Sequence, residues 1–260
     1  MAATQNPFGT ASMAEGYARS RPPLHRRIIE RAFALSALRP PVGLALDSGC
    51  GSGLSTRPLL DFAQRVIGID PVAGMAALAR EVAPGAWFLA GRAEALPVRS
   101  GSVDLITAAG SLNYSEPQAA LCEAKRALAP GGAMCVYDFS QGRASRESPA
   151  LARWFTAEFE RRYPMPHGEA IRLDPGILNR ISPDFPVIRS EAFELGVAMT
   201  RSAYADYILT ETNVAAAVRD GAGMAEIRSW LDESLRPVFG DGTQEVLFPG
   251  YLAWMQPQIG

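Results

Sequence analysis

The sequence contains few cysteines and few histidines, and both shortages exclude kinds of site. Its 260 residues include three cysteines, Cys50, Cys122 and Cys135, and two histidines, His25 and His167. The odd number of cysteines and the lack of a C-x-x-C pair argue against a disulfide framework and against a zinc site. We therefore expect neither disulfides nor a bound metal.

A strong charge of one sign and long hydrophobic runs are also missing. The formal net charge is −2, which gives no overall reason to bind nucleic acid or anionic membranes. No apolar run approaches the roughly 20 residues of a membrane-spanning helix, and residues 1–6 lack the features of a signal peptide. We expect a cytoplasmic protein, a monomer or homodimer, whose partner is a small molecule and neither nucleic acid nor membrane.

Short apolar segments alternate with helical segments in the first half of the chain. The expected strands are Val42–Leu46, Arg65–Ile69, Ala86–Leu89, Val103–Thr107 and Ala133–Phe139. The expected helices are Met13–Ser20, His25–Leu38, a segment through Leu59, Leu60 and Phe62, Ala73–Val82 and Pro117–Leu128. Near-continuous apolar strands separated by helices predict a parallel sheet that is covered on both faces.

After Ser140 the pattern changes. Helices are expected at Ser148–Arg162, Ser202–Thr210, Thr212–Arg219 and Met224–Leu235, and strands at Val187–Met199 and Glu245–Trp254. Residues 163–186 are rich in proline and turn residues. We expect an N-terminal helical lid (1–41), a cofactor-binding core (42–145), a cap that sets substrate specificity (146–241) and a final strand of the core sheet (242–260).

The glycine-rich turn after the first strand is the most informative segment. Leu44–Ser48 leads into Gly49, Gly51 and Gly53, and a helix is expected to follow. Such turns let a ligand approach the backbone where side chains would clash. Asp70 closes the next strand, at the position that typically holds ribose hydroxyls in this kind of fold.

The spacing of the glycines separates the cofactor classes. A dinucleotide fingerprint requires glycine or alanine at Leu54 or Thr56, and a P-loop requires a lysine that is absent here. An NAD-dependent oxidoreductase is therefore disfavoured. The order from Asp47 through the three glycines instead resembles the first motif of class I S-adenosylmethionine-dependent methyltransferases.

Later segments resemble further motifs of the same family in the same order. They are 66–70, 91–97 followed by 101–104, and 128–132, so the resemblance covers Leu44–Ser140. Residues 17–23 are similar to the N-terminal helix that folds over the cofactor in ubiquinone-biosynthesis and trans-aconitate methyltransferases, although a proline-capped helix is an equal reading. The resemblance implies an α/β fold with a mostly parallel seven-stranded Rossmann-like sheet, helices on both faces, a mainly helical cap, and Glu245–Trp254 as its antiparallel strand.

The resemblance also implies a set of cofactor-binding residues. They are Tyr17, Arg21, Asp47, Gly49, Cys50, Gly51, Asp70, Pro71, Met75, Arg92, Ala93, Glu94 and Gly110. Asp47 and the turn would face the amino-acid end of S-adenosylmethionine, Asp70 its ribose, and residues 92–94 its adenine. Many members have aspartate where this chain has Arg92. Because arginine cannot accept a hydrogen bond from the adenine amino group, that contact would pass to Glu94, a backbone group or water.

Residues for the acceptor and for catalysis have weaker signals. Asn113 and Tyr114 follow the fourth strand, where ligands collect in parallel sheets, but they could be plain loop residues. Tyr204, Tyr207 and Asn213 are substrate candidates in the cap. His167 and Asp138 are catalytic candidates: His167, in the expected cap, as a general base, and Asp138 because it closes the fifth strand in the same layer. His25 is interpreted as ordinary helix surface, and Cys50 as a packing residue.

We expect direct methyl transfer from S-adenosylmethionine to a small molecule, with S-adenosylhomocysteine as product. A non-catalytic nucleotide-binding protein is the alternative. Nucleic-acid methylation is disfavoured by the charge and by the lack of an Asp/Asn-Pro-Pro-aromatic motif.

Overall fold

The computed structural model describes residues 20–165 and 171–258. The chain divides into two compact units, each assembled from separate stretches of sequence. The sheet unit contains residues 23–139, 169–193 and 250–260, and the cap unit contains residues 1–22, 140–168 and 194–249. Residues 24–35 form a helix of the sheet unit, whereas residues 1–41 were predicted to form a lid.

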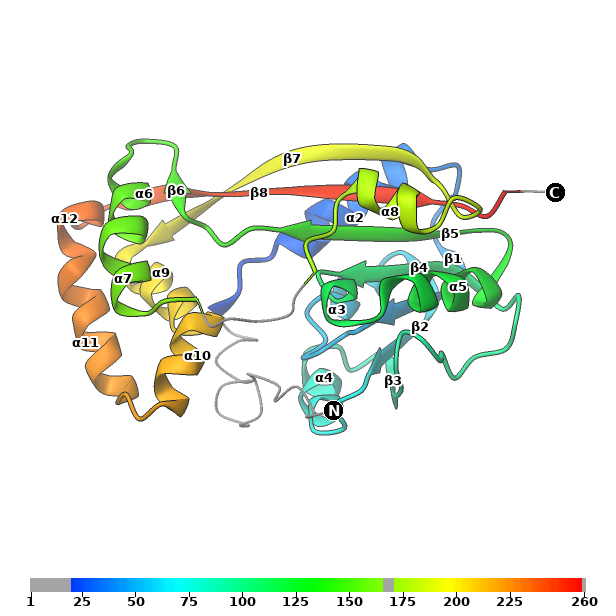
Figure 1. Cartoon of the computed structure of the whole chain (residues 1–260), viewed down its shortest axis with the longest axis horizontal. Helices are drawn as coiled ribbons and strands as arrows, with labels where there is room; N and C mark the ends of the chain where they lie inside the picture. The colour runs from blue at the N-terminus through cyan, green and yellow to red at the C-terminus, as the bar shows by residue number, and fades with distance from the viewer. Residues whose placement is uncertain (1–19, 166–170, 259–260) are drawn as a thin grey trace. The chain divides into compact units, whose positions relative to one another are not determined.

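A mostly parallel sheet is the centre of the fold (Figure 1). Its strands follow the order β3-β2-β1-β4-β5-β8-β6, and β7 also pairs with β8. The strands are β1 (Val42–Ser48), β2 (Ala63–Asp70), β3 (Trp87–Ala90), β4 (Val103–Ala109), β5 (Leu128–Phe139), β6 (Ala144–Ser145), β7 (Val187–Thr200) and β8 (Thr243–Met255). Strands β1 to β5 pair in parallel, and β8 is antiparallel to β5 and β6. The predicted α/β class and parallel sheet are confirmed, with eight strands among the described residues in place of seven.

Helices cover both faces of the sheet in the sheet unit. They are α2 (Leu24–Leu35), α3 (Thr56–Leu59), α4 (Met75–Val82), the 3-10 turn η1 (Leu112–Tyr114), α5 (Pro117–Ala127) and α8 (Pro175–Ile181). Apolar residues of α5 and α8 share one buried cluster with the strands, for example Leu121 and Leu178 against Met134. On the other face α2 packs through Phe33, whose ring lies 6.4 Å from that of Trp254.

Helix α3 is shorter than the sequence predicts. The amides of Asp61 and Phe62 bond back three residues, to the carbonyls of Pro58 and Leu59, which tightens and ends the helix. The Phe62 carbonyl then accepts from the amide of Val42, so the chain has already joined β1 before β2 begins. The apolar residues after Leu59 therefore lead into the sheet.

Short helices form most of the cap unit. They are α6 (Ala150–Trp154), the π-helical turn η2 (Phe155–Phe159), α7 (Glu160–Arg162), α9 (Arg201–Ile208), α10 (Thr212–Arg219), α11 (Met224–Ser234) and α12 (Arg236–Phe239). Their shared core is aromatic: the Trp154 ring stacks 5.6 Å from Phe159 and 5.9 Å from Trp230, and meets Tyr204 edge-on at 6.1 Å. The helices predicted after Ser148 are confirmed within one or two residues.

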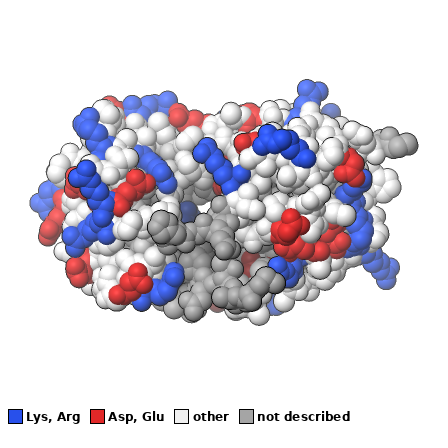
Figure 2. All heavy atoms as spheres, viewed as in Figure 1, with Lys and Arg blue, Asp and Glu red and all other residues white. Residues whose placement is uncertain are grey.

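The distribution of charge on the surface and the lengths of the helices agree with the near-neutral net charge and the lack of long apolar runs in the sequence. Both signs of charge are interspersed over the visible face of each unit (Figure 2). Within residues 20–165 and 171–258, no helix is long and apolar enough to cross a membrane. Cys50, Cys122 and Cys135 are all free thiols, as predicted.

Candidate functional site

The glycine turn at the carboxyl end of β1 has a backbone that other residues rarely adopt. Gly49, Gly51 and Gly53 have φ angles of 73°, 50° and 85°. A Cβ added to Gly49 would lie 2.8 Å from the Ser111 hydroxyl oxygen, so glycine is required where the loop after β4 packs against the turn. Among residues 20–165 and 171–258, no atom lies within 4 Å of a Cβ added to Gly51, which leaves open space on that side of the turn in this part of the chain.

Asp70, the last residue of β2, faces this turn. One carboxylate oxygen accepts from the Gly51 amide at 2.9 Å and the other from the Val72 amide at 2.9 Å. These two bonds fix the orientation of the carboxylate. A carboxylate has about four acceptor positions, so two remain for a ligand.

Asp47 lies beneath the turn and is fully buried. Its carboxylate accepts from the hydroxyls of Ser55 and Thr56, both at 2.7 Å, and from that of Thr107 at 2.9 Å. Burial raises the pKa of Asp47, although the three hydroxyls act in the opposite direction. The side chain thus joins the turn to α3 and β4. Asp47 was predicted to face the cofactor, and its three hydroxyl donors were not predicted, although two of them lie only eight and nine residues after it.

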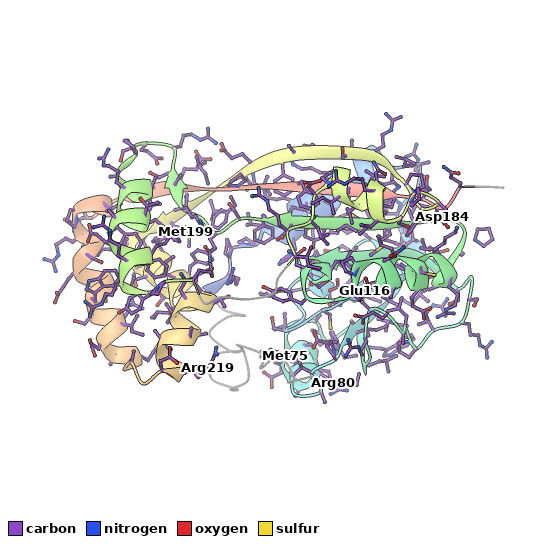
Figure 3. All side chains as sticks on the ribbon, in the orientation of Figure 1. Met75, Arg80, Glu116, Asp184, Met199 and Arg219 are labelled. Atoms are coloured by element: carbon purple, nitrogen blue, oxygen red, sulfur yellow. The ribbon has the colours of Figure 1, made fainter. Side chains whose placement is uncertain are left out.

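Cys50 and Met75 pack close to the turn. Burial raises the pKa of the Cys50 thiol far above its usual range, so the thiol stays protonated. This agrees with a packing residue. Met75 is buried at the start of α4, and Arg80 lies in the last turn of the same helix (Figure 3). Pro71 is exposed before this helix.

The loop after β3 is held by Glu94. Its carboxylate accepts from the Glu116 amide at 2.9 Å and lies 3.4 Å from the Arg92 guanidinium. Burial acts to raise the pKa of Glu94, but the bonds from Glu116 and Arg92 lower it overall. Glu116 itself caps α5 by accepting from two amides (Figure 3). Glu94 therefore ties the loop to α5, while Ala93 stays half-buried beside it and Arg92 is exposed.

A polar pair closes the carboxyl ends of β4 and β5. The Asn113 side-chain amide donates to Asp138 at 2.8 Å, and the amide of Phe139 donates to the other carboxylate oxygen at 2.8 Å. Burial raises the pKa of Asp138. Gly110 has a φ angle of 62°, and a Cβ there would lie 2.9 Å from this carboxylate. The neighbouring Tyr114 is 75% exposed.

The residues predicted in the cap lie in the buried interior of the cap unit. Tyr204 donates to the Gly142 carbonyl at 2.6 Å, and Tyr207 accepts from the Gly142 amide at 3.3 Å. Asn213 donates to the carbonyl of Tyr163 at 2.8 Å. It also lines a cavity of about 340 Å³ with Tyr163, Met165 and Ala216. The hydrogen bonds of Tyr204, Tyr207 and Asn213 therefore stabilise the fold of the cap unit.

Arg21 also makes its contacts within the cap unit. Its guanidinium lies 3.0 Å from the buried carboxylate of Glu211, donates to the Thr210 carbonyl at 3.3 Å and lies 5.0 Å from the centre of the Tyr207 ring. Two other predicted residues, Tyr17 and His167, and most of the predicted helix Met13–Ser20 lie outside the described residues.

The sequence interpretation of His25 as helix surface was wrong. His25 is half-buried in the first turn of α2, and its Nδ1 lies 2.9 Å from the hydroxyl of the fully buried Tyr137. No local sequence pattern predicts the contact between His25 and Tyr137, because the two residues are 112 positions apart.

Comparison with known proteins agrees with this geometry. Residues 46–136, from β1 into β5, match the family model described as a methyltransferase domain. Within this segment the chain is thus similar to methyltransferases. Over 96 residues it is 38% identical to a demethylmenaquinone methyltransferase of Renibacterium salmoninarum, and that alignment covers 36% of this chain and 40% of the relative. The chain therefore spans less than half of that relative's length.

Solved structures show that the fold extends beyond the methyltransferase domain. A protein assigned as a type II methyltransferase from Anaeromyxobacter dehalogenans superposes with a TM-score of 0.70 at 22% identity, over 88% of this chain and 94% of that one. The [4+2]-cyclase SpnF superposes with a TM-score of 0.54 at 21% identity, over 90% and 81% of the two chains. At these identities the likeness concerns the fold alone, and the fold serves more than one reaction.

Proposed function

We propose that the protein transfers a methyl group from S-adenosylmethionine to a small-molecule acceptor. The observation that carries this proposal is the arrangement of Asp70 and the glycine turn. A carboxylate oriented by two backbone amides stands next to a turn that has open space at Gly51. The match of residues 46–136 to a methyltransferase domain supports the same conclusion.

The residues of the turn fit this cofactor. The two remaining acceptor positions of Asp70 suit a pair of ribose hydroxyls, and the open side of Gly51 lets a ligand lie against the backbone. Ala93 and the loop that Glu94 ties to α5 would border the adenine. Asp47 would act from beneath, by holding the turn in its conformation.

S-adenosylmethionine supplies a methyl group that its sulfonium already activates, so the protein mainly has to align the acceptor and exclude water. Asp138 would accept a proton from the acceptor, because it lies at the carboxyl end of β5 and burial raises its pKa. Asn113 would hold this carboxylate in place through the 2.8 Å hydrogen bond.

The acceptor would be chosen outside the methyltransferase domain. Residues 137–258 lie beyond the family match and include most of the cap unit. The name of the Renibacterium relative makes quinone precursors reasonable first compounds to test. A second candidate function, cofactor binding with a reaction other than methyl transfer or with none, is favoured by the fold shared with a [4+2]-cyclase.

Titration calorimetry followed by a transfer assay separates these functions. We expect S-adenosylhomocysteine to bind with a dissociation constant on the order of micromolar, and label from methyl-labelled S-adenosylmethionine to enter small molecules of a cell extract. Binding without transfer would favour the second candidate. Binding of NAD but not of S-adenosylhomocysteine would refute the proposal.

A further inference from the structure

The cavity of about 340 Å³ noted at Asn213 is lined entirely by residues of the cap unit. Part of its lining is one face of α10. Ala216, Ala217 and Asp220 follow Asn213 by three, four and seven positions, which places all four on the same side of a helix. The rest of the lining is the segment 162–165. The cavity is therefore a feature of a single unit.

The burial of the lining residues gives the cavity an inner end and a mouth. Asn213 and Tyr163 are only 1% and 6% exposed, whereas Ala216 and Ala217 are half-buried and Met165 is 45% exposed. Asn213 and Tyr163 thus form the inner end, and the exposed residues form the mouth. The two alanines leave room between the inner end and the mouth because their side chains are small.

The side-chain amide of Asn213 has an acceptor that is not used. Its Nδ2 donates to the Tyr163 carbonyl at 2.8 Å. Because a carbonyl can only accept, this bond determines which end of the amide is the nitrogen and which is the oxygen. Within residues 20–165 and 171–258, the buried Oδ1 has no hydrogen-bond partner. A buried acceptor without a donor is costly, so this oxygen is the atom of Asn213 that is left for a ligand.

The neighbouring polar side chains are paired with one another. The Tyr163 hydroxyl accepts from Arg162 Nε at 3.0 Å, and the Arg162 guanidinium lies 3.3 Å from the Glu226 carboxylate. The Tyr163 ring meets Trp230 edge-on at 5.3 Å, which fixes this part of the lining. A molecule in the cavity therefore meets the apolar alanine and methionine side chains and, at the inner end, the unused acceptor of Asn213.

We infer that this cavity binds a small uncharged molecule with an apolar body and an O–H or N–H group, which donates to Asn213 Oδ1. An uncharged molecule is favoured because the charged lining residues, Arg162 and Asp220, are both exposed. The volume is near the lower end of small-molecule sites, about 300–1,000 Å³. Two molecules meet this description: a separate ligand of the cap unit, or the methyl acceptor. Only the second identification rests on the proposed function.

Two probes of equal shape test the cavity and its acceptor. Indole and benzofuran have nearly the same ring system, but only indole has an N–H donor. Binding is followed by NMR of the methionine methyl groups. The Met165 signal, assigned with Met165→Leu, reports on the cavity, and that of Met199, a buried methionine outside the lining, is the internal control (Figure 3). We expect indole to shift the Met165 signal and to bind about fivefold more tightly than benzofuran. No shift with either probe, or equal affinities, would overturn the inference.

Two substitutions separate the volume of the cavity from its acceptor. Ala216→Leu fills the cavity from a half-buried position and should weaken indole about tenfold or more. The matched control is Ala225→Leu, an exposed change on α11 outside the lining, which should bind indole like the wild type. Asn213→Ala should remove the preference for indole over benzofuran. Because this variant also loses the bond to Tyr163, Ala216→Leu keeps the test decisive if Asn213→Ala does not fold. Unchanged indole binding in Ala216→Leu would overturn the inference.

Label transfer from S-adenosylmethionine into small molecules of a cell extract then identifies the natural occupant. If the methyl acceptor occupies the cavity, both added indole and Ala216→Leu lower the transfer, while the affinity for S-adenosylhomocysteine stays that of the wild type. If a separate ligand occupies it, transfer is the same with and without indole. A wild-type protein that binds no S-adenosylhomocysteine would refute the proposed function, but the indole titration would still test the cavity, so the two failures are distinguishable.

Discussion

Asp47 and Asp70 lie at the carboxyl ends of the neighbouring strands β1 and β2, but their surroundings give them different roles. Asp47 is fully buried and its carboxylate receives three hydroxyl donors, so it is part of the structure beneath the turn. Asp70 is half-buried, and each of its oxygens receives one backbone amide. Because the free acceptor positions are those of Asp70, this residue is the one expected to contact a ligand.

Asp70→Ala should lower the affinity for S-adenosylhomocysteine at least tenfold and leave the fold intact. A charge-assisted hydrogen bond contributes roughly 1.5–3 kcal/mol, and about 1.4 kcal/mol corresponds to a factor of ten. Calorimetry of the variant measures the effect. The matched control is Asp184→Ala, an exposed carboxylate of the same unit that pairs with Lys125 at 2.5 Å, and it should bind like the wild type (Figure 3). An unchanged dissociation constant for Asp70→Ala would make Asp70 a turn residue only.

Asp138 should give the activity a pH dependence that an exposed aspartate would not give. A general base must be deprotonated to work, and burial raises the pKa of Asp138 above its ordinary value of about 4. Transfer should therefore fall, as the pH decreases, at a higher pH than ordinary aspartate titration predicts. A pH–rate profile of label transfer measures this. Asp138→Asn should reduce transfer strongly at all pH values while cofactor affinity is kept, and a variant as active as the wild type would exclude this role.

At the scale of elements, the helices and strands that a local sequence pattern determines could be predicted from the sequence. Buried parallel strands are near-continuous apolar segments, so β1, β2 and β4 are evident. The two-residue strand β6 and the end of α3 are not, because each depends on pairing with a distant segment. The same limit applies to the site. The glycines and Asp70 follow a spacing along the chain. The hydrogen bond from Thr107 to Asp47 and the one between Tyr137 and His25 instead join residues 60 and 112 positions apart.

Two glycines of one turn should respond differently to alanine. Both have positive φ angles, a conformation that costs about 1–2 kcal/mol for a residue with a Cβ. Gly49→Ala adds a collision with Ser111 and should lose about 2–5 kcal/mol of stability in total. Gly51→Ala should lose only about 1–2 kcal/mol, but its methyl group enters the open space where the cofactor is proposed to lie.

Thermal unfolding and calorimetry together test this pair. The expected result is a low melting temperature for Gly49→Ala, and a nearly normal one for Gly51→Ala with S-adenosylhomocysteine bound at least tenfold more weakly. Normal cofactor affinity in Gly51→Ala would mean that the open side of the turn is not the binding surface.

At the scale of the whole molecule, both units are assembled from three separate stretches of chain. The family match falls entirely in the sheet unit, and the cap unit has no counterpart in it. Within the cap unit, the pairing of β6 with β8 joins the second and third stretches through the backbone, and side chains add to this connection. Tyr204 and Tyr207 bind the backbone of Gly142 from α9, which joins its second stretch to its third.

The first stretch of the cap unit joins the third through the ion pair of Arg21 and Glu211. The two side chains are 14% and 3% exposed, the closest atoms are 3.0 Å apart, and Gln141 donates to the same carboxylate. Breaking a buried pair by removing one partner leaves the other charge uncompensated and costs about 3–5 kcal/mol. Replacing both partners by apolar residues avoids that cost. Arg21→Met should therefore lower the stability of the full-length protein by about 3 kcal/mol, and Arg21→Met with Glu211→Leu should recover much of the loss.

Chemical denaturation of the two single variants and the double variant measures this as a double-mutant cycle. Arg26→Ala, which breaks an exposed pair with Glu30, is the control and should unfold like the wild type. If Arg21→Met were as stable as this control, the first stretch would not be held by Glu211. A double variant as unstable as the sum of the two single ones would mean that the residues do not act as a pair. A cycle that shows coupling, together with unchanged affinity of Arg21→Met for S-adenosylhomocysteine, would assign Arg21 to the cap unit in place of the cofactor contact predicted from the sequence.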